Sequence, residues 1–440
     1  METVSFARSQ FPAIEKSDGT FAFMDNAGGS AVLESVGDRI RDYILGSNVQ
    51  LGASYPTSQL STTLVREATL AGTRFVNAGS PKEVVLGNST TQLMENLARA
   101  MEAKVEEGAE IIISDTDHEA NCGPWVRLAK RKNLALKIWK NEGPDQTLSL
   151  DALKQLLTPN TRLVAVTHCS NILGTVNDVK AIASLVHSVP GAELCVDGVA
   201  YAPHFAIDVQ DLDIDYYCFS WYKVFGPHIS QLYTASRTFP RLTSLAHFFI
   251  HEHDKPYWLQ PGNVNYELSA SIPAVLGYIG DLGRSASERL GIAGQKLVRG
   301  AEGVSREDIE RGYQRIAEQE LTLTTKLLSY LNSKPSIYTV LGAKTATSSG
   351  TRVPTIAFRV SHIKSEDFVT KVDGYGLGIR FGHFYAYRLI VDSLGLSEED
   401  GIVRVSLVHY NTVEEVERLV AAFEEVLKTM VESEGTGPVA

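Results

Sequence analysis

The stretch IDYYCFSWYKVFGPHISQLY, residues 214–233, decides the fold. Two apolar segments flank a turn that contains Gly226-Pro227, and this pattern predicts a strand, a tight turn and a return strand. Lys223 is the one basic residue of the turn, and its neighbours are aromatic or aliphatic. Because burial disfavours the ammonium form, the pattern indicates a neutral amine that can attack a carbonyl, as a Schiff-base lysine does. Taken alone, the stretch also fits a lysine that snorkels from the end of a core strand.

The composition excludes several classes of function. The chain has 440 residues, of which 44% are hydrophobic and 21% charged, as in soluble globular proteins. Its formal net charge of −11 argues against nucleic acid as a partner, because clustered cations drive binding to phosphate backbones. Four cysteines without C-x-x-C spacing favour reduced core residues and no metal site. No apolar stretch has the length of a membrane span, so we expect a cytoplasmic protein.

From residue 83 onward, short apolar strands alternate with amphipathic helices. Strands that are apolar throughout are typical of a parallel sheet with helices on both faces. The sequence therefore predicts an α/β fold with a mainly parallel, seven-stranded sheet. The return strand after Pro227 is one of the seven, and the others are Glu83–Gly87, Glu110–Ser114, Leu136–Trp139, Arg162–Thr167, Glu193–Val196 and Tyr216–Ser220.

Three regions are expected along the chain: an N-terminal arm (1–30), a large domain (31–295) and a smaller C-terminal α/β domain (296–440). Pro240–Pro273 reads as an irregular aromatic stretch. A long helix over Ser305–Ser333 then leads to the smaller unit, with strands predicted at Thr355–Val360, Leu377–Arg380 and Gly401–Ser406.

Polar residues follow the ends of the predicted strands, where parallel sheets bind their ligands. Hydroxyls at a helix N-terminus suit a phosphate dianion, although a plain helix cap is the alternative. A carboxylate at a strand end can keep a pyridine nitrogen protonated, and a histidine can lie flat over such a ring. For the carboxylate the alternative is a simple turn, and for the histidine it is a structural role. The residues in question are Ser89, Thr90, His118, Asn171, Asp197 and Ser220.

Eight segments, in order along nearly the whole chain, resemble the cysteine-desulfurase-like branch of the class V aminotransferases, which are fold-type I enzymes that use pyridoxal 5′-phosphate. This resemblance implies a homodimer with shared active sites and a small amino-acid substrate. The segments are DNAGGS (25–30), TDHEANCGPW (116–125), SNILGTVND (170–178), VDGVAYAPH (196–204), FSWYKVFGPH (219–228), PGNVNYE (261–267), GIRFGHFYA (378–386) and VRVSLVHYNT (403–412).

The resemblance also implies residue roles. Lys223 corresponds to the Schiff-base lysine, Asp197 to the partner of the pyridine nitrogen and His118 to the residue stacked on the ring. Asn171 corresponds to the contact of the 3′-oxygen, and Arg404 to the group that binds the substrate carboxylate, a task that suits its planar fork. A surface or interface ion pair is the alternative for Arg404. The implied phosphate contacts are Ser89, Thr90, Ser220 and Tyr222.

Several positions depart from the family's pattern. Tyr385 stands where the desulfurases carry their nucleophilic cysteine, so persulfide chemistry lacks its thiol. We expect Tyr385 to be catalytic in another way, as a wall over the α-carbon, an orienting donor or a general acid or base. Tyr222 stands where those enzymes have histidine, and Ala200 where they often have glutamine. Asn263 replaces a threonine that, in the family, reaches the phosphate of the neighbouring subunit. These departures leave the cofactor in place but make the detailed phosphate contacts an open question.

Members of this branch without the cysteine include carbon–sulfur lyases and the fungal loline-biosynthesis enzyme, which closes a ring by a Mannich reaction. Both activities pass through the same α-carbanion (quinonoid), so the core residues do not separate them. We expect carbon–carbon bond formation or cyclisation, as in alkaloid biosynthesis, on a bulky or cyclic amino acid, with β-elimination as the alternative. Cysteine desulfuration and a non-catalytic binding module rank lower. An aromatic wall favours the bulky substrate: Phe249, Tyr257, Trp258, Tyr266, Phe384, Tyr385 and Tyr387.

Overall fold

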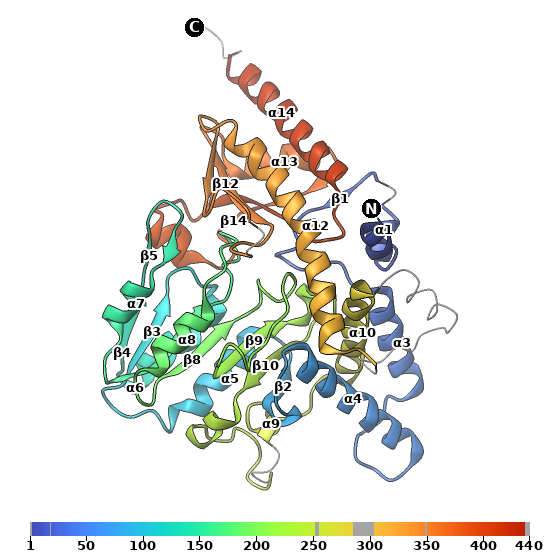
Figure 1. The fold of residues 1–440 in the computed structure, drawn as a ribbon, viewed down its shortest axis with the longest axis vertical. Coiled ribbons are helices and arrows are strands. Elements are labelled where there is room, and N and C mark those ends of the chain that lie inside the picture. Colours follow the sequence, from blue (N-terminus) through green and yellow to red (C-terminus); the bar gives the residue numbers. More distant parts are fainter. Residues whose placement is uncertain (1, 18, 251–254, 285–302, 348–349, 436–440) are drawn as a thin grey trace.

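A computed structural model describes residues 2–17, 19–250, 255–284, 303–347 and 350–435. The predicted sheet of seven strands is present, in the order β2-β10-β9-β8-β7-β3-β4, and β10 alone runs antiparallel to its neighbours (Figure 1). The α/β architecture with a mainly parallel sheet is thus confirmed. The strands are β2 Val84–Gly87, β3 Glu110–Ser114, β4 Ala135–Trp139, β7 Thr161–Thr167, β8 Glu193–Asp197, β9 Tyr216–Ser220 and β10 Ser230–Thr234.

Helices cover both faces of this sheet. Neighbouring residues of each strand point to opposite faces, so each strand contributes side chains to a core on either side. In β3, Ile111 and Ile113 pack with helices α5 (Thr90–Glu102) and α6 (Gly123–Lys132). Ile112, between them, faces the other core. That second core also contains residues of α4 Pro56–Phe75, α7 Leu150–Leu156, α8 Val179–His187 and the N-terminal part of α12 Arg306–Asn332.

Helix α10 (Tyr266–Gly283) is the element that the sequence pattern concealed. We predicted irregular chain as far as Pro273, and this is wrong from Tyr266 onward. Asn265 caps the helix by accepting a hydrogen bond from the Leu268 amide. Most residues of α10 are buried, since it packs among α3 (Glu34–Gly46), α4 and α12, so it lacks the polar stripe of a surface helix.

The second sheet is antiparallel and has the order β11-β12-β15-β14. Helix α12 runs from the central sheet to this smaller one, and α14 extends away from it to the C-terminal end (Figure 1). The domain boundary predicted at residues 295 and 296 lies outside the described residues. The elements are β11 Tyr338–Leu341, β12 Thr355–Val360, α13 Ser365–Asp373, β14 Arg380–Gly382, β15 Ile402–Ser406 and α14 Val413–Gly435.

The single strand predicted over Leu377–Arg380 is wrong, because the chain divides there into two short strands. β13 (Leu377–Gly378) pairs with β1 (Ala22–Phe23) from the N-terminal segment, whereas β14 pairs with β15. β1 and β13 thus form a two-stranded sheet of their own, and a single bridge between Asp25 and Ser406 connects the N-terminal segment to β15. The remaining elements are α1 Glu2–Arg8, α2 Pro12–Glu15, α9 Lys255–Trp258, β5 Asn141–Glu142, β6 Thr147–Leu148 and the short 3₁₀ or π turns η1 Pro81–Glu83, η2 Glu119–Asn121, η3 Trp221–Lys223, η4 Ser236–Arg241 and η5 Arg388–Ser393.

The hairpin that contains Lys223 forms as predicted, with Ser220 opposite Ser230 in the β9–β10 ladder. The N-terminal turn clamps it, because both the amide and the hydroxyl of Ser30 donate to the carbonyl oxygen of Tyr222. Gly29 allows this approach: a Cβ there would lie 3.2 Å from the Tyr222 ring. The lysine turn is therefore fixed by a segment nearly 200 residues away in the sequence.

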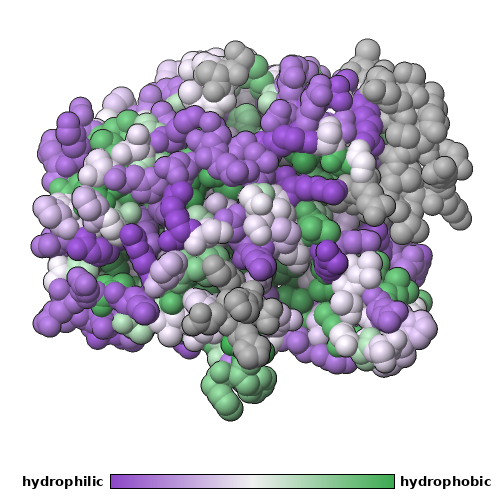
Figure 2. Space-filling model, turned by 60° about the horizontal axis from the view of Figure 1, so that its bottom comes forward, coloured by the Kyte–Doolittle hydropathy of each residue, from purple (hydrophilic) through white to green (hydrophobic). Residues whose placement is uncertain are grey.

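The outer surface is mainly hydrophilic on the face drawn in Figure 2, with apolar side chains scattered in it and one apolar projection at its lower edge. Among the described residues, no helix combines the length and the apolar character needed to span a bilayer.

Candidate active site

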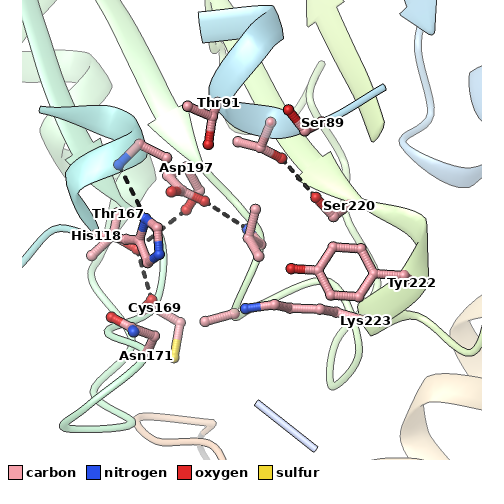
Figure 3. Close-up of a pocket in the computed structure, with 14 residues that line it drawn as sticks. Ser89, Thr91, His118, Thr167, Cys169, Asn171, Asp197, Ser220, Tyr222 and Lys223 are labelled. Atoms are coloured by element: carbon pink, nitrogen blue, oxygen red, sulfur yellow. Dashed lines mark hydrogen bonds between the residues drawn. The ribbon is translucent and has the colours of Figure 1, made fainter. Parts of the chain in front are cut away.

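A cavity of about 90 Å³ lies at the carboxyl ends of the central strands (Figure 3). Residues that follow different strands converge on it, as the topology of a parallel sheet requires. Eight of the residues singled out from the sequence line this one cavity: Ser89, Thr90, His118, Asn171, Asp197, Ser220, Tyr222 and Lys223.

Hydroxyl groups and a helix N-terminus form one end of the cavity. Ser89 caps α5 by accepting a hydrogen bond from the Gln92 amide, and Thr90 begins the helix. The Thr90 hydroxyl lies 2.8 Å from that of Ser220, which lies 2.7 Å from that of Ser230. Unpaired amides and hydroxyls at a helix N-terminus favour a phosphate group.

Lys223 lines the cavity and is 8% exposed. Burial lowers the pKa of its ammonium group to about 8, and the nearby positive charge of Arg404 acts in the same direction. The carboxylates of Asp197 and Asp25 offset part of this shift. The amine is therefore neutral far more often near physiological pH than that of an exposed lysine, and the neutral form is the one that attacks a carbonyl.

Asp197 ends β8 on the floor of the cavity. Burial raises the pKa of its carboxyl group to about 6, against a hydrogen bond of 2.9 Å from the Val199 amide. The neighbouring Asp117 is also buried, and burial raises its pKa to about 8. Its carboxyl group binds the amides of Asn121 and Thr167. At neutral pH Asp117 is mainly protonated, so Asp197 carries the negative charge of this pair.

His118 and Asn171 form the opposite wall of the cavity (Figure 3). The Nδ1 atom of His118 accepts a hydrogen bond from the Ala120 amide, and burial lowers the pKa of the ring to about 3. The imidazole is therefore neutral. Asn171 donates from Nδ2 to the carbonyl oxygen of Phe384, while its buried Oδ1 has no protein partner. A buried acceptor without a partner indicates that a bound ligand donates a hydrogen bond to it.

A wider cleft of about 550 Å³ opens from the same lysine. Arg404 lies in its wall, 2% exposed, with Nη2 at 2.9 Å from Asp25 Oδ1 and Nε without a partner. The ring of Phe384 covers the guanidinium at 3.8 Å. Tyr385 is 69% exposed, and its ring centroid lies 5.3 Å from that of His118. Phe384 and Tyr385 both have positive φ, an uncommon conformation for such residues.

Two residues predicted for the site lie elsewhere in this chain. Asn263 is exposed and Tyr266 begins α10, and neither lines the cavity or the cleft. The predicted aromatic wall does not form within one chain. Only two of its seven residues, Phe384 and Tyr385, line the cleft. Trp258 instead packs against Phe239 in the core.

Three residues of the site were missed: Asp25, Arg380 and Ser230. Asp25 pairs with both Arg404 and Arg380, which are adjacent across β14 and β15. The segment DNAGGS, which contains Asp25, is part of the family resemblance. Nothing in its own sequence, however, predicts that it lies beside residues 380 and 404. Ser230 could have been found, because pairing the two strands of the hairpin puts it opposite Ser220.

Comparison with known proteins gives the family. The model of aminotransferase class-V matches residues 22–246 and 308–419. The chain belongs to the class V aminotransferase family. It is 45% identical over 431 residues to the aminotransferase-like protein FGM3 of Gibberella zeae, covering 97% of this chain and 98% of that protein. It is 33% identical to the cysteine desulfurase-like protein ustD of Aspergillus flavus, covering 96% and 90% of the two chains.

A solved structure shows the same fold. The cysteine desulfurase of Thermococcus onnurineus superposes with a TM-score of 0.81 over 97% of this chain and 98% of its own, at 22% identity. The class V aminotransferases and cysteine desulfurases are pyridoxal-phosphate enzymes, and this class V member is one of them.

The cavity fits that cofactor. A hydroxyl-lined helix N-terminus, a carboxylate on the floor, a buried lysine and a neutral imidazole surround one space, and the free Oδ1 of Asn171 is an acceptor for a ligand hydroxyl. We expect Ser89, Thr90 and Ser220 to bind the phosphate of the cofactor. Asp197 is expected to bind the pyridine nitrogen. These assignments remain predictions from the site's chemistry and the family resemblance.

Proposed function

We propose that this class V enzyme removes the α-proton of a bulky or cyclic amino acid and directs the resulting carbanion into a carbon–carbon bond. When bound, pyridoxal phosphate withdraws electrons from the α-carbon of an attached amino acid, so that this carbon can lose a proton. The buried amine of Lys223 then accepts or returns that proton at Nζ, a role that its lowered pKa supports. Asp197, as the anion, would keep the pyridine nitrogen of the bound cofactor protonated.

Arg404 is the candidate receptor for the substrate carboxylate. Its Nε lacks a partner, and a carboxylate there would gain a charge-assisted hydrogen bond. Phe384 covers the face of the guanidinium, whereas a carboxylate binds to the N–H groups at its edge. Phe384 and Tyr385 both have positive φ, a strained conformation that is common at functional sites.

One observation carries the choice of reaction: Tyr385 is among the described residues that line the wider cleft, and no cysteine is. Cys169 lines the smaller cavity around Lys223, where it is fully buried. The four cysteines are buried, and burial raises the pKa of each thiol well above its usual range. A protonated, buried thiol cannot attack the sulfur of a substrate. The cleft of about 550 Å³ also supports a substrate larger than cysteine. β-Elimination is the second candidate, since it uses the same proton removal.

Product analysis tests this proposal. The holoenzyme is incubated with candidate amino acids and an aldehyde, and the products are examined by mass spectrometry. We expect an amino-acid product with a new carbon–carbon bond, and no persulfide on the protein after exposure to cysteine. Release of pyruvate or another keto acid alone would replace the proposal with elimination, and a persulfide formed at a catalytic rate would return the chain to the desulfurases.

We also propose that the enzyme is a homodimer with shared active sites. Phe248 is 100% exposed and Phe249 61% exposed, on the segment that leads toward Asn263 and Tyr266. Large exposed apolar side chains such as these two favour a protein contact. In a dimer, Asn263 and Tyr266 would reach the cofactor of the partner subunit, whereas they do not line the cavity of their own chain. Light scattering at micromolar concentration should give twice the monomer mass. A fully active monomer would contradict the proposal.

A further inference from the structure

The cleft beyond Lys223 has two ends of opposite charge. Its buried inner end is lined by Lys223 and Arg404. Arg380, whose side chain is 59% exposed, also lines the cleft, and the carboxylate of Asp25 pairs with both arginines. Its outer wall contains Glu398 and Glu399, from the turn that precedes β15. A ligand that fills this cleft therefore meets Lys223 and Arg404 at the buried end and can reach the exposed carboxylates of Glu398 and Glu399.

Two buried groups show that the cleft is built for a ligand. Arg404 Nε and Asn171 Oδ1 have no protein partner, although the two residues are only 2% and 7% exposed. Both residues line the cleft. Buried polar atoms without partners are costly, so a bound molecule is expected to satisfy them. The inner end then holds the carboxylate of an amino acid.

The outer end has the features of a site for a cation. The Tyr387 hydroxyl donates to Glu398 Oε2 at 3.3 Å, which orients that carboxylate. The exposed ring of Tyr385 adds an aromatic face to the same cleft. The nearby guanidinium of Arg388 is neutralised by Glu119 at 3.3 Å and does not line the cleft. Two carboxylates and an aromatic face together attract a positive group.

We propose that the substrate's side chain ends in a cation, an ammonium or a guanidinium group, held by Glu398 and Glu399. This inference rests on the proposed function for the amino-acid end of the substrate, and it adds the chemistry of the other end. The cleft of about 550 Å³ has room for a side chain as long as that of arginine.

Titration of the holoenzyme tests this, with the visible spectrum of the cofactor as the measure of binding. Arginine and citrulline form a matched pair, because they have nearly the same shape and differ in charge. We expect arginine to bind about fivefold to tenfold more tightly, the range that two partly exposed carboxylates provide. High salt should narrow this difference. Lysine should likewise bind more tightly than norleucine.

Variants locate the effect. Glu398→Gln with Glu399→Gln should remove the preference for arginine and leave the affinity for citrulline unchanged. Glu106→Gln with Glu107→Gln is the matched control, since this exposed pair precedes β3 at the opposite edge of the sheet, and the preference should persist. Equal binding of arginine and citrulline by the unaltered enzyme, or a preference that survives the first double substitution, would overturn the inference. Absence of any spectral change with every amino acid would overturn the proposed function as well.

Discussion

Arg404 Nη2 lies 2.9 Å from Asp25 Oδ1, and this ion pair ties the N-terminal segment to β15 at the wall of the cleft. Asp25→Asn should destabilise the protein by about 3 kcal/mol, because it leaves the buried guanidinium without its counter-charge. Urea unfolding measures this. Asp38→Asn, which breaks the exposed pair with Arg41, is the control and should change the free energy of unfolding by at most about 0.5 kcal/mol. Equal effects would remove the structural role assigned to Asp25.

Asp197 should make the cofactor-free protein less stable at high pH. Its folded-state pKa of about 6 exceeds the value of about 4 for an unfolded chain, so the folded protein holds the proton more tightly between these values. The stability from this proton is present below pH 4 and lost as the pH rises through about 6. Asp197→Asn should therefore raise the free energy of unfolding by about 2 to 3 kcal/mol at pH 8 and change it little at pH 4.

The control for Asp197 is the exposed Asp42, whose replacement by asparagine should change the free energy of unfolding by at most about 0.5 kcal/mol. A variant at Asp197 that is less stable than the unaltered protein at pH 8 would contradict the account of this carboxylate.

The crossing of α10 and α12 should tolerate no side chain at Gly312. A Cβ there would lie 2.2 Å from the carbonyl oxygen of Ile279. Gly312→Ala should cost about 2 kcal/mol or more in the free energy of unfolding, as overpacking does. Gly37→Ala in α3 is the matched control: no atom lies within 4 Å of its Cβ, and alanine there should add about 0.5 to 1 kcal/mol. A stabilising effect at Gly312 would refute the close contact.

Attachment of the cofactor should depend on the neutral amine of Lys223. Because burial lowers its pKa to about 8, the attachment rate should rise with pH and reach half its maximum near pH 8. Borohydride reduction followed by peptide mass spectrometry measures both the rate and the modified residue. A rate that still rises steeply above pH 10, or a label on another lysine, would contradict the assignment.

The sequence predicted the central sheet because its information is local. Each strand is a short apolar run with a helix after it, and the residues at the strand ends must meet at one edge of a parallel sheet. The sequence alone therefore places His118, Asn171, Asp197 and Lys223 in one site. The family resemblance then supplied the cofactor.

The missed features depend on contacts between distant parts of the chain. Helix α10 is buried among other helices, so its apolar sequence has no stripe to reveal it, and Pro273 made the segment look irregular. Asp25 meets Arg404 only after the N-terminal strand β1 pairs with β13. The aromatic residues that seemed to form one wall lie on separate elements, because spacing in sequence does not fix which face of the fold a loop occupies.

Exchange of the α-proton for deuterium tests the central claim most directly. The holoenzyme and its Lys223→Ala variant are incubated in D₂O with arginine and with other amino acids, and the label at the α-carbon is followed by proton NMR. We predict enzyme-dependent exchange with the unaltered protein and at least a hundredfold slower exchange with the variant, as expected for the loss of a general base. No exchange with any amino acid, or equal exchange by the two proteins, would contradict the account.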